Sequence, residues 1–338
     1  MLVSVQALRA FAAWLVVFHH FMQVFFGFDT DNPAGHLLST RGQMGVDLFF
    51  VISGFVIYIT TADRSMKTLR FLWQRAARIV PVYWFYTAVT AAILFFASDL
   101  MPDYGLDLPS LIMGLLFIPN ENPAGFGDYP ILPVGWTLNF EMMFYLVFAL
   151  SFLLPPRARM WIVIMMIALL NLLLPRLDMI SSFYTDPIIY EFLLGLGVGM
   201  LYHHGKLSPA TTRTPWAILA LGCMALMLCF TDQSAWRLAV WGLPAALLVI
   251  AMIRLEPIFT RCHALRQMGD QSYSVYLVHV IVLWLAHAFL HEHWGLPVWL
   301  TLAISLVIIA TLSWASFELL EKQLSRRLKP PRRASQAA

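Results

Sequence analysis

The feature that most constrains this chain is a series of apolar runs close to the length, roughly 17 to 25 residues, that a helix needs to cross a bilayer. Only 12% of the 338 residues are charged, and soluble domains carry about twice that share. We therefore predict an all-α fold, a polytopic membrane helix bundle with about ten transmembrane helices, because backbone groups in lipid must bond within each helix. The predicted spans are residues 5–27, 44–62, 79–98, 135–154, 160–174, 187–202, 215–231, 236–253, 272–290 and 298–316.

The basic residues are distributed unevenly between the segments that join these runs. If the N-terminus is cytoplasmic, all but three of the 22 Lys and Arg residues lie on the cytoplasmic side, the exceptions being Arg41, Arg176 and Arg237. Cytoplasmic loops of membrane proteins are enriched in Lys and Arg, so we predict that both termini are cytoplasmic. The formal net charge of +3 is too small to indicate a nucleic-acid partner.

The first run, QALRAFAAWLVVFHHFMQVFF, holds an arginine and two histidines in otherwise apolar sequence. Arg9 and His20 are 11 residues apart, which places them on one helix face about 16 Å apart along the axis. Ionisable side chains within a membrane are costly and are usually functional. Two interpretations remain open: Arg9 anchors the helix at the cytoplasmic interface while the histidines bond neighbouring helices, or the stripe is a functional site.

Two carboxylates lie near the predicted outer ends of later runs. Asp47 opens GVDLFFVISGF, whose small residues permit close helix packing, and its carboxylate could orient a histidine or a substrate hydroxyl. Glu141 lies in PVGWTLNFEMMFY and needs a partner such as a histidine or a sugar hydroxyl. Trp136, in the same segment, is either an interfacial anchor or a stacking surface for a sugar ring.

Arg75 and Arg78 are three residues apart in FLWQRAARIVPVYWF and therefore share one helix face at the predicted cytoplasmic edge. Two guanidinium groups in this position can hold a phosphate or pyrophosphate bidentately. The alternative is that both arginines contact lipid headgroups. A metal site is not expected, because the cluster around His287 and His291 has the character of a solvated helix end.

Five segments together resemble one known family: QALRAFAAWLVVFHHF, GVDLFFVISGF, RAARIVPVYW, VGWTLNFEMMFY and SYSVYLVH. They are similar to the acyltransferase family 3 membrane proteins, which O-acylate cell-surface and exported carbohydrates. The chain looks most like the stand-alone acetyltransferases that decorate bacterial exopolysaccharides. The resemblance implies one acyltransferase-3-like transmembrane domain over residues 1–320, followed by a cytoplasmic basic tail over residues 321–338.

The resemblance also assigns roles to particular residues. The essential arginine and histidine of the family's first span fall on Arg9 and His20, and its R-x-x-R pair falls on Arg75 and Arg78. The late S-Y-x-x-Y-L-x-H stretch ends at His279, which makes that histidine a candidate for substrate binding.

The C-terminal E-K-P signature of the family meets Glu321 and Lys322 but then Gln323 in place of proline. The resemblance therefore says less about the geometry of this end, and the role of Glu321 stays open.

These assignments imply an integral membrane O-acyltransferase that moves an acyl group, expected to be acetyl, from cytoplasmic acyl-CoA to a hydroxyl of an exopolysaccharide, another cell-surface glycan or a lipid-linked precursor. A neutral His20 would act as general base or accept the acyl group itself, oriented by Asp47 or Glu141. Acetyl-CoA is the expected donor, and the carbohydrate or glycolipid acceptor, membrane lipids and polysaccharide-synthesis proteins are the expected partners. The expected location is the bacterial inner membrane.

Two other functions compete with this one. A membrane transporter would use the polar stripe to carry protons, an acyl group or a small solute, although matched halves with broken helices are not evident in the sequence. A non-catalytic component of a polysaccharide export assembly would not need His20 at all. The sequence leaves open the acceptor sugar, the length of the acyl group, the covalent or general-base route and the oligomeric state.

Overall fold

The computed structural model describes residues 1–62, 67–231 and 236–327, and within these ranges the chain forms helices and no strand. The all-α class is thereby confirmed. Short π-helical turns at Leu238–Gly242, His287–His293 and Phe317–Glu321 adjoin α10, α13 and α14. The α-helices are α1 Val3–Phe26, α2 Pro33–Arg41, α3 Met44–Thr61, α4 Thr68–Phe96, α5 Leu108–Leu115, α6 Trp136–Leu150, α7 Pro156–Ala168, α8 Glu191–His203, α9 Thr214–Cys229, α10 Leu243–Arg254, α11 Glu256–Phe259, α12 His263–Asp270, α13 Ser272–Ala286, α14 Val298–Ser316 and α15 Lys322–Arg327.

Several of these helices have the length and apolar character of membrane spans. Six such stretches occur among the described residues: Val3–Phe26, Pro33–Thr61, Thr68–Phe96, Pro133–Leu153, Ser272–His293 and Val298–Leu324. Four shorter apolar helices, Ala158–Leu173, Pro187–His203, Thr214–Cys229 and Leu238–Arg254, coincide with the other predicted spans. The chain thus has the character of a multi-pass membrane protein, while the count of ten and the orientation stay predictions.

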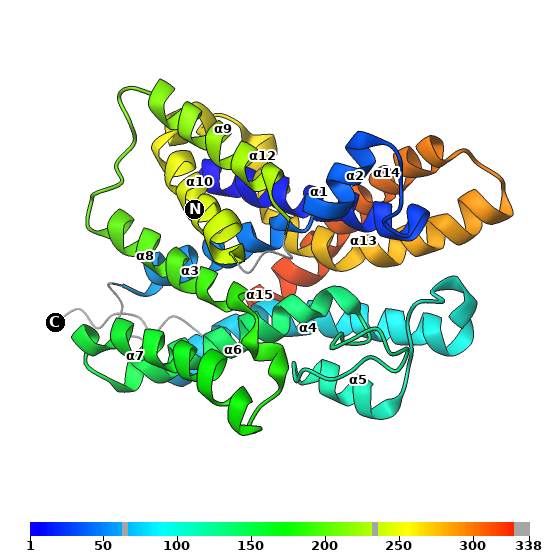
Figure 1. Cartoon of the computed structure of the whole chain (residues 1–338), viewed down its shortest axis with the longest axis horizontal. Helices are drawn as coiled ribbons and strands as arrows, with labels where there is room; N and C mark the ends of the chain where they lie inside the picture. The colour runs from blue at the N-terminus through cyan, green and yellow to red at the C-terminus, as the bar shows by residue number, and fades with distance from the viewer. Residues whose placement is uncertain (63–66, 232–235, 328–338) are drawn as a thin grey trace.

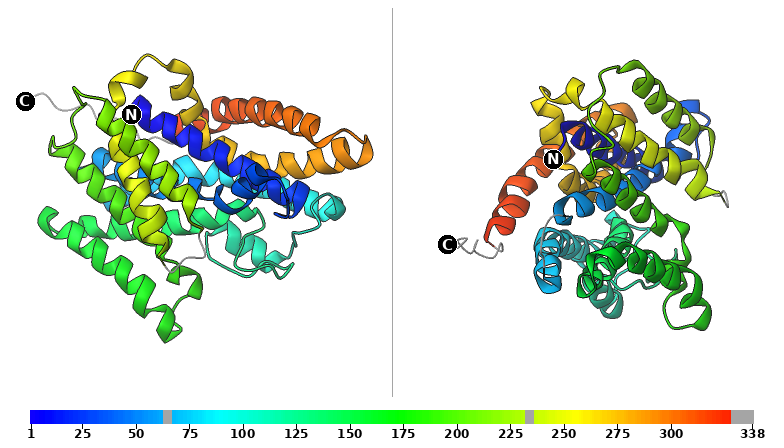
Figure 2. Two further views of the ribbon diagram at one scale, coloured as in Figure 1. Left: turned by 45° about the horizontal axis from the view of Figure 1, so that its top comes forward. Right: turned by 90° about the vertical axis from the view of Figure 1, so that its left-hand side faces the viewer.

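The helices form two groups with α3 and α8 between them (Figure 1). One group contains α4, α5, α6 and α7, and the other contains α1, α2, α9, α10 and α12 to α14. The end-on view in Figure 2 keeps the two groups apart in the same way. The site described below lies where α1, α3 and α13 face α4 and α6.

Glycines allow α3 to pack directly against the backbones of its neighbours. A Cβ atom added to Gly54 would lie 2.2 Å from the carbonyl oxygen of Phe192 in α8, and one added to Gly195 would lie 2.0 Å from that of Val51. On the other side, a Cβ atom at Gly45 would meet a carbonyl oxygen of α1 at 2.5 Å. Small residues permit such close helix contacts, so α3 holds a fixed position between α1 and α8.

The C-terminal helix continues through the predicted boundary between domain and tail. α14 leads through Phe317–Glu321 directly into α15. Glu321 is buried, and its carboxylate accepts a hydrogen bond of 3.3 Å from Ser274 Oγ in α13. The first residues of the predicted tail are therefore part of the helix bundle, and residues 328–338 lie outside the described residues.

Candidate active site

Three arginines line a cavity between α1, α3, α4, α6 and α13, which we call the arginine cavity. Arg9 comes from α1, Arg75 and Arg78 come from α4, and Glu141 of α6 is the acidic residue in the lining. The structure thus brings four of the predicted site residues together from three separate helices. With three cations against one carboxylate, the lining attracts anions.

Two of these arginines are held by hydrogen bonds to neighbouring side chains. Arg9 Nη1 donates to Gln6 Oε1 at 2.9 Å, and the amide of Gln6 donates to the carboxylate of Asp270 in α12. Arg75 Nη2 donates to Thr60 Oγ1 of α3 at 3.0 Å. Both guanidinium groups therefore have defined orientations before any ligand binds.

The third arginine has its donors available. Among the described residues, no hydrogen bond occupies the guanidinium of Arg78, although Glu141 and Glu321 interact with it electrostatically. Glu321 interacts electrostatically with Arg9 as well. Arg78 can therefore bind an anion without first breaking a hydrogen bond within the protein.

Glu141 is bonded inside the arginine cavity. Its Oε1 accepts a hydrogen bond of 3.0 Å from Ser53 Oγ, and it also accepts one from the hydroxyl of Tyr145. The glutamate thus links α3 to α6 and balances part of the arginine charge.

A second cavity, which we call the histidine cavity, has a volume of about 590 Å³, compared with about 90 Å³ for the arginine cavity. His20 of α1 and Trp136 at the start of α6 line it. Tyr104, Phe126 and Tyr129 from the segment between α4 and α6 line it as well. Among the described residues, this cavity is therefore wide and aromatic and has no arginine in its lining, whereas the arginine cavity is narrow and cationic.

The aromatic rings of the histidine cavity contact one another in sequence. The ring centroids of Tyr104 and Phe126 are 5.5 Å apart, those of Phe126 and Tyr129 are 5.3 Å apart, and those of Tyr129 and Trp136 are 6.4 Å apart. Burial raises the pKa of Tyr104 to about 12, so its phenol is neutral near pH 7 and can donate a hydrogen bond. Flat apolar rings can stack on the C–H face of a sugar ring, and a hydroxyl donor beside them can bond to a sugar hydroxyl.

The two cavities share a boundary. Val46 of α3 and Tyr276 of α13 line both of them. The Tyr276 hydroxyl lies 3.0 Å from Thr137 Oγ1 and donates to the carbonyl oxygen of Val134 at 3.1 Å. We call these two side chains, Val46 and Tyr276, the partition.

His20 meets His279 across the interface between α1 and α13. His20 Nδ1 lies 3.1 Å from His279 Nε2 and 3.0 Å from the carbonyl oxygen of Val16. His279 Nδ1 lies 3.1 Å from the carbonyl oxygen of Val275, and this histidine is fully buried. The sequence indicated both histidines as candidates but not their contact.

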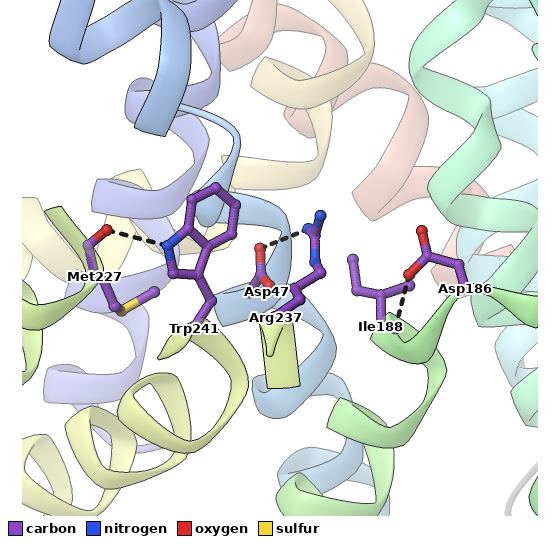
Figure 3. A network of polar contacts seen from close by, with 6 residues as sticks. All are labelled: Asp47, Asp186, Ile188, Met227, Arg237 and Trp241. Atoms are coloured by element: carbon purple, nitrogen blue, oxygen red, sulfur yellow. Dashed lines mark hydrogen bonds and ion pairs between the residues drawn. The ribbon is translucent and has the colours of Figure 1, made fainter. Parts of the chain in front are cut away.

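Asp47 lies in a different environment from His20. Its Oδ2 accepts a hydrogen bond of 3.1 Å from Arg237 Nη2, whose guanidinium lies over the ring of Trp241 (Figure 3). Glu191 of α8, which is also fully buried, interacts with Asp47 electrostatically. Asp47 lines neither cavity, and Glu141 is bonded in the arginine cavity. The expectation that one of these carboxylates orients His20 is therefore not supported by their positions.

Three residues of the site were missed or left without a role. Gln6 is one helical turn before Arg9 on the same face, so its contact could have been anticipated. Tyr276 lies inside the SYSVYLVH segment, but nothing in the sequence places it against Val46. Glu321 is far from Arg9 and Arg78 in the sequence, so only the tertiary structure shows that it interacts with them. Among the described residues, no three His, Cys, Asp or Glu side chains are arranged to hold a metal ion.

The fold and the site define an all-helical protein of multi-pass membrane character, in which an anion-attracting cavity meets a histidine centre. The acyltransferase domain family known as acyltransferase 3 matches residues 2–318. The chain belongs to this family, and the expectation of an O-acetyltransferase is confirmed at the level of the enzyme class.

Named relatives resemble the chain over most of its length. It is 34% identical over 310 residues to the exopolysaccharide production protein ExoZ of Rhizobium meliloti (strain 1021), an alignment that covers 89% of this chain and 94% of that protein. It is 26% identical to the acyltransferase MdmB of Streptomyces mycarofaciens, covering 92% of this chain and 87% of that protein. It is 25% identical to the peptidoglycan O-acetyltransferase OatA of Listeria monocytogenes, covering 83% of this chain but only 49% of that protein. No solved structure matches the chain.

Proposed function

We propose that the protein is an integral membrane O-acetyltransferase of the bacterial inner membrane. It moves an acetyl group from cytoplasmic acetyl-CoA to a hydroxyl of an exopolysaccharide, another cell-surface glycan or a lipid-linked precursor. The observation that carries this proposal is the meeting of a narrow arginine cavity and a wide aromatic histidine cavity at Val46 and Tyr276. The names of the relatives, which refer to exopolysaccharide production and peptidoglycan O-acetylation, agree with this acceptor class.

The arginine cavity suits the donor. Arg75 and Arg78 would hold the phosphates of CoA, because guanidinium groups bind phosphate oxygens in pairs. Arg9, held by Gln6, lines the same cavity. The narrow cavity matches the extended pantetheine arm, which would bring the thioester to the partition.

The histidine cavity suits the acceptor. Its greater volume accommodates a sugar ring, and Trp136 offers an aromatic face for stacking. With cytoplasmic termini, this cavity would face the outer side of the membrane, where exported carbohydrates are presented. Only the acyl group, and not the whole CoA molecule, then has to pass the partition.

The reaction that we propose uses a neutral imidazole as general base. His20 Nε2 takes the proton of the acceptor hydroxyl while the hydroxyl oxygen forms a bond to the thioester carbonyl carbon. The carbon–sulfur bond then breaks, and the thiolate of CoA receives the proton from His20. The products are the O-acetylated carbohydrate and free CoA, and the histidine returns to its neutral form.

Transfer of labelled acetyl from acetyl-CoA to cell-surface polysaccharide tests this function directly. Membranes carrying wild type, His20→Ala or the control His36→Ala, whose histidine is exposed on α2, are compared at equal folded levels. We expect a loss of transfer of about 100-fold or more in His20→Ala, because general base catalysis contributes about that much, and wild-type transfer in the control. Full activity of His20→Ala would overturn the catalytic role of His20.

A further inference from the structure

The atoms that meet in the contact between His20 and His279 indicate which ring nitrogens carry hydrogen. The contact joins Nδ1 of one ring to Nε2 of the other at 3.1 Å. Each Nδ1 atom also faces a main-chain carbonyl oxygen, that of Val16 or that of Val275. A carbonyl oxygen can only accept a hydrogen bond, so these two contacts determine where the ring protons lie.

The proton of His279 is fixed by Val275. Because His279 Nδ1 lies 3.1 Å from the Val275 carbonyl oxygen, this nitrogen carries the hydrogen and donates. In a neutral imidazole the other nitrogen then has a free lone pair. His279 Nε2 is therefore a hydrogen-bond acceptor directed at His20.

The proton of His20 follows from two independent contacts. Its Nδ1 faces the carbonyl oxygen of Val16 at 3.0 Å and the acceptor nitrogen of His279 at 3.1 Å. Both of these atoms are acceptors and require a hydrogen on His20 Nδ1, so this N–H group donates to both of them. The hydrogen of the neutral His20 ring is thus on Nδ1, and the lone pair is on Nε2, the nitrogen that has no hydrogen-bond partner among the described residues.

We propose that His279 is the positioning residue that holds His20 in the Nδ1–H tautomer and thereby presents the Nε2 lone pair of His20 to the acceptor hydroxyl. His20 lines the histidine cavity, whereas His279 is fully buried and lines neither cavity. This role replaces the earlier expectation that His279 binds substrate. It also explains how His20 is oriented without a carboxylate, since Asp47 and Glu141 are both engaged elsewhere.

The first test rests on the proposed function and uses two replacements of similar size at position 279. His279→Gln keeps an acceptor oxygen for the His20 Nδ1–H group but cannot take up a proton, whereas His279→Met offers no comparable acceptor. At equal folded levels, we expect His279→Gln to keep kcat within about threefold of wild type, and His279→Met to lower kcat about tenfold or more with KM for acetyl-CoA unchanged. Equal kcat values for the two variants, whether high or low, would overturn the proposal.

The second test does not depend on activity or on a variant at position 279. The imidazole nitrogen resonances of protein labelled with ¹⁵N-histidine distinguish the two neutral tautomers, and comparison with His20→Gln assigns the signals of His20. We expect the Nδ1–H form in the wild-type protein. An Nε2–H signal would overturn the positioning role even if His20 proves essential, whereas an Nδ1–H signal in a wild-type protein that transfers no acetyl group would count against the proposed function alone.

Discussion

The arginine cavity and the histidine cavity differ in volume, charge and the way in which their reactive groups are held. The arginine cavity is narrow, and its cations are held by side-chain partners, as Gln6 and Thr60 hold Arg9 and Arg75. The histidine cavity is wide and aromatic, and His20 is held by a main-chain carbonyl and a second neutral ring. The difference separates the two tasks of an acyltransferase, since charge binds an anionic donor and an uncharged environment keeps an imidazole in its neutral, proton-accepting form.

This separation also explains why an arginine and a histidine on one face of α1 do not form a single site. Arg9 lines the arginine cavity and His20 lines the histidine cavity, on either side of Val46 and Tyr276. A cation close to His20 would disfavour the imidazolium that forms during general base catalysis. The distance between the two residues along α1 is therefore itself useful for the chemistry that we propose.

The largest effect that we expect comes from a region outside both cavities. Asp47→Asn combined with Glu191→Gln removes the fully buried carboxylate that bonds Arg237 and the glutamate beside it, and loss of a buried partner costs about 3–5 kcal/mol. We expect a clearly lower Tm in detergent, and unchanged kcat for the molecules that remain folded. Asp178→Asn, an exposed position, is the control. A fall in kcat at unchanged Tm would place Asp47 in the histidine cavity after all and break the comparison.

A smaller effect is expected within the arginine cavity. Arg75→Ala together with Arg78→Ala removes two charge-assisted contacts to phosphate, each contributing about 1.5 kcal/mol or more, so KM for acetyl-CoA should rise about 100-fold. KM for the acceptor should not change, which steady-state kinetics with each substrate varied would establish. Arg70→Ala, an exposed arginine of the same helix, should behave as wild type. An equal rise in both KM values would mean that the two cavities do not separate the substrates.

The smallest effect that we expect concerns the partition, and it tests directly whether the boundary between the two cavities limits the length of the acyl group. Val46→Ala removes two methyl groups where the cavities meet, whereas Val56→Ala removes the same groups from the arginine cavity alone. At about 0.8 kcal/mol for each carbon, we expect the first variant to raise the use of butyryl-CoA relative to acetyl-CoA about tenfold. The second should leave this ratio unchanged. Equal ratios in both variants would show that the partition does not limit the acyl group.

Much of the fold could be predicted from apolar runs because a helix in lipid must be apolar along its length. The longer apolar helices coincide with the predicted runs, although α4 begins at Thr68, well before the run predicted from residue 79, and short helices such as α2 and α12 lie outside the runs. The glycines of GVDLFFVISGF lie at close helix contacts, as small residues do. The boundary predicted at residue 320 falls within a continuous helical segment, since α14 leads through Phe317–Glu321 into α15. Sequence shows where apolar character ends but not whether the following polar turn packs against a neighbour, as Glu321 does against Ser274.

The sequence by itself determined the helical class, the family and the residues that carry charge in apolar surroundings. Spacing within a helix is local, so the common face of Arg9 and His20 and that of Arg75 and Arg78 follow from the pitch of the helix alone. Only the tertiary structure decided the partners, which lie far away in the sequence, as His279 lies 259 residues from His20. Asp47 illustrates the same limit, because a carboxylate in an apolar run requires a partner but only the packing of α3 against its neighbours shows that this partner is Arg237 and not a histidine.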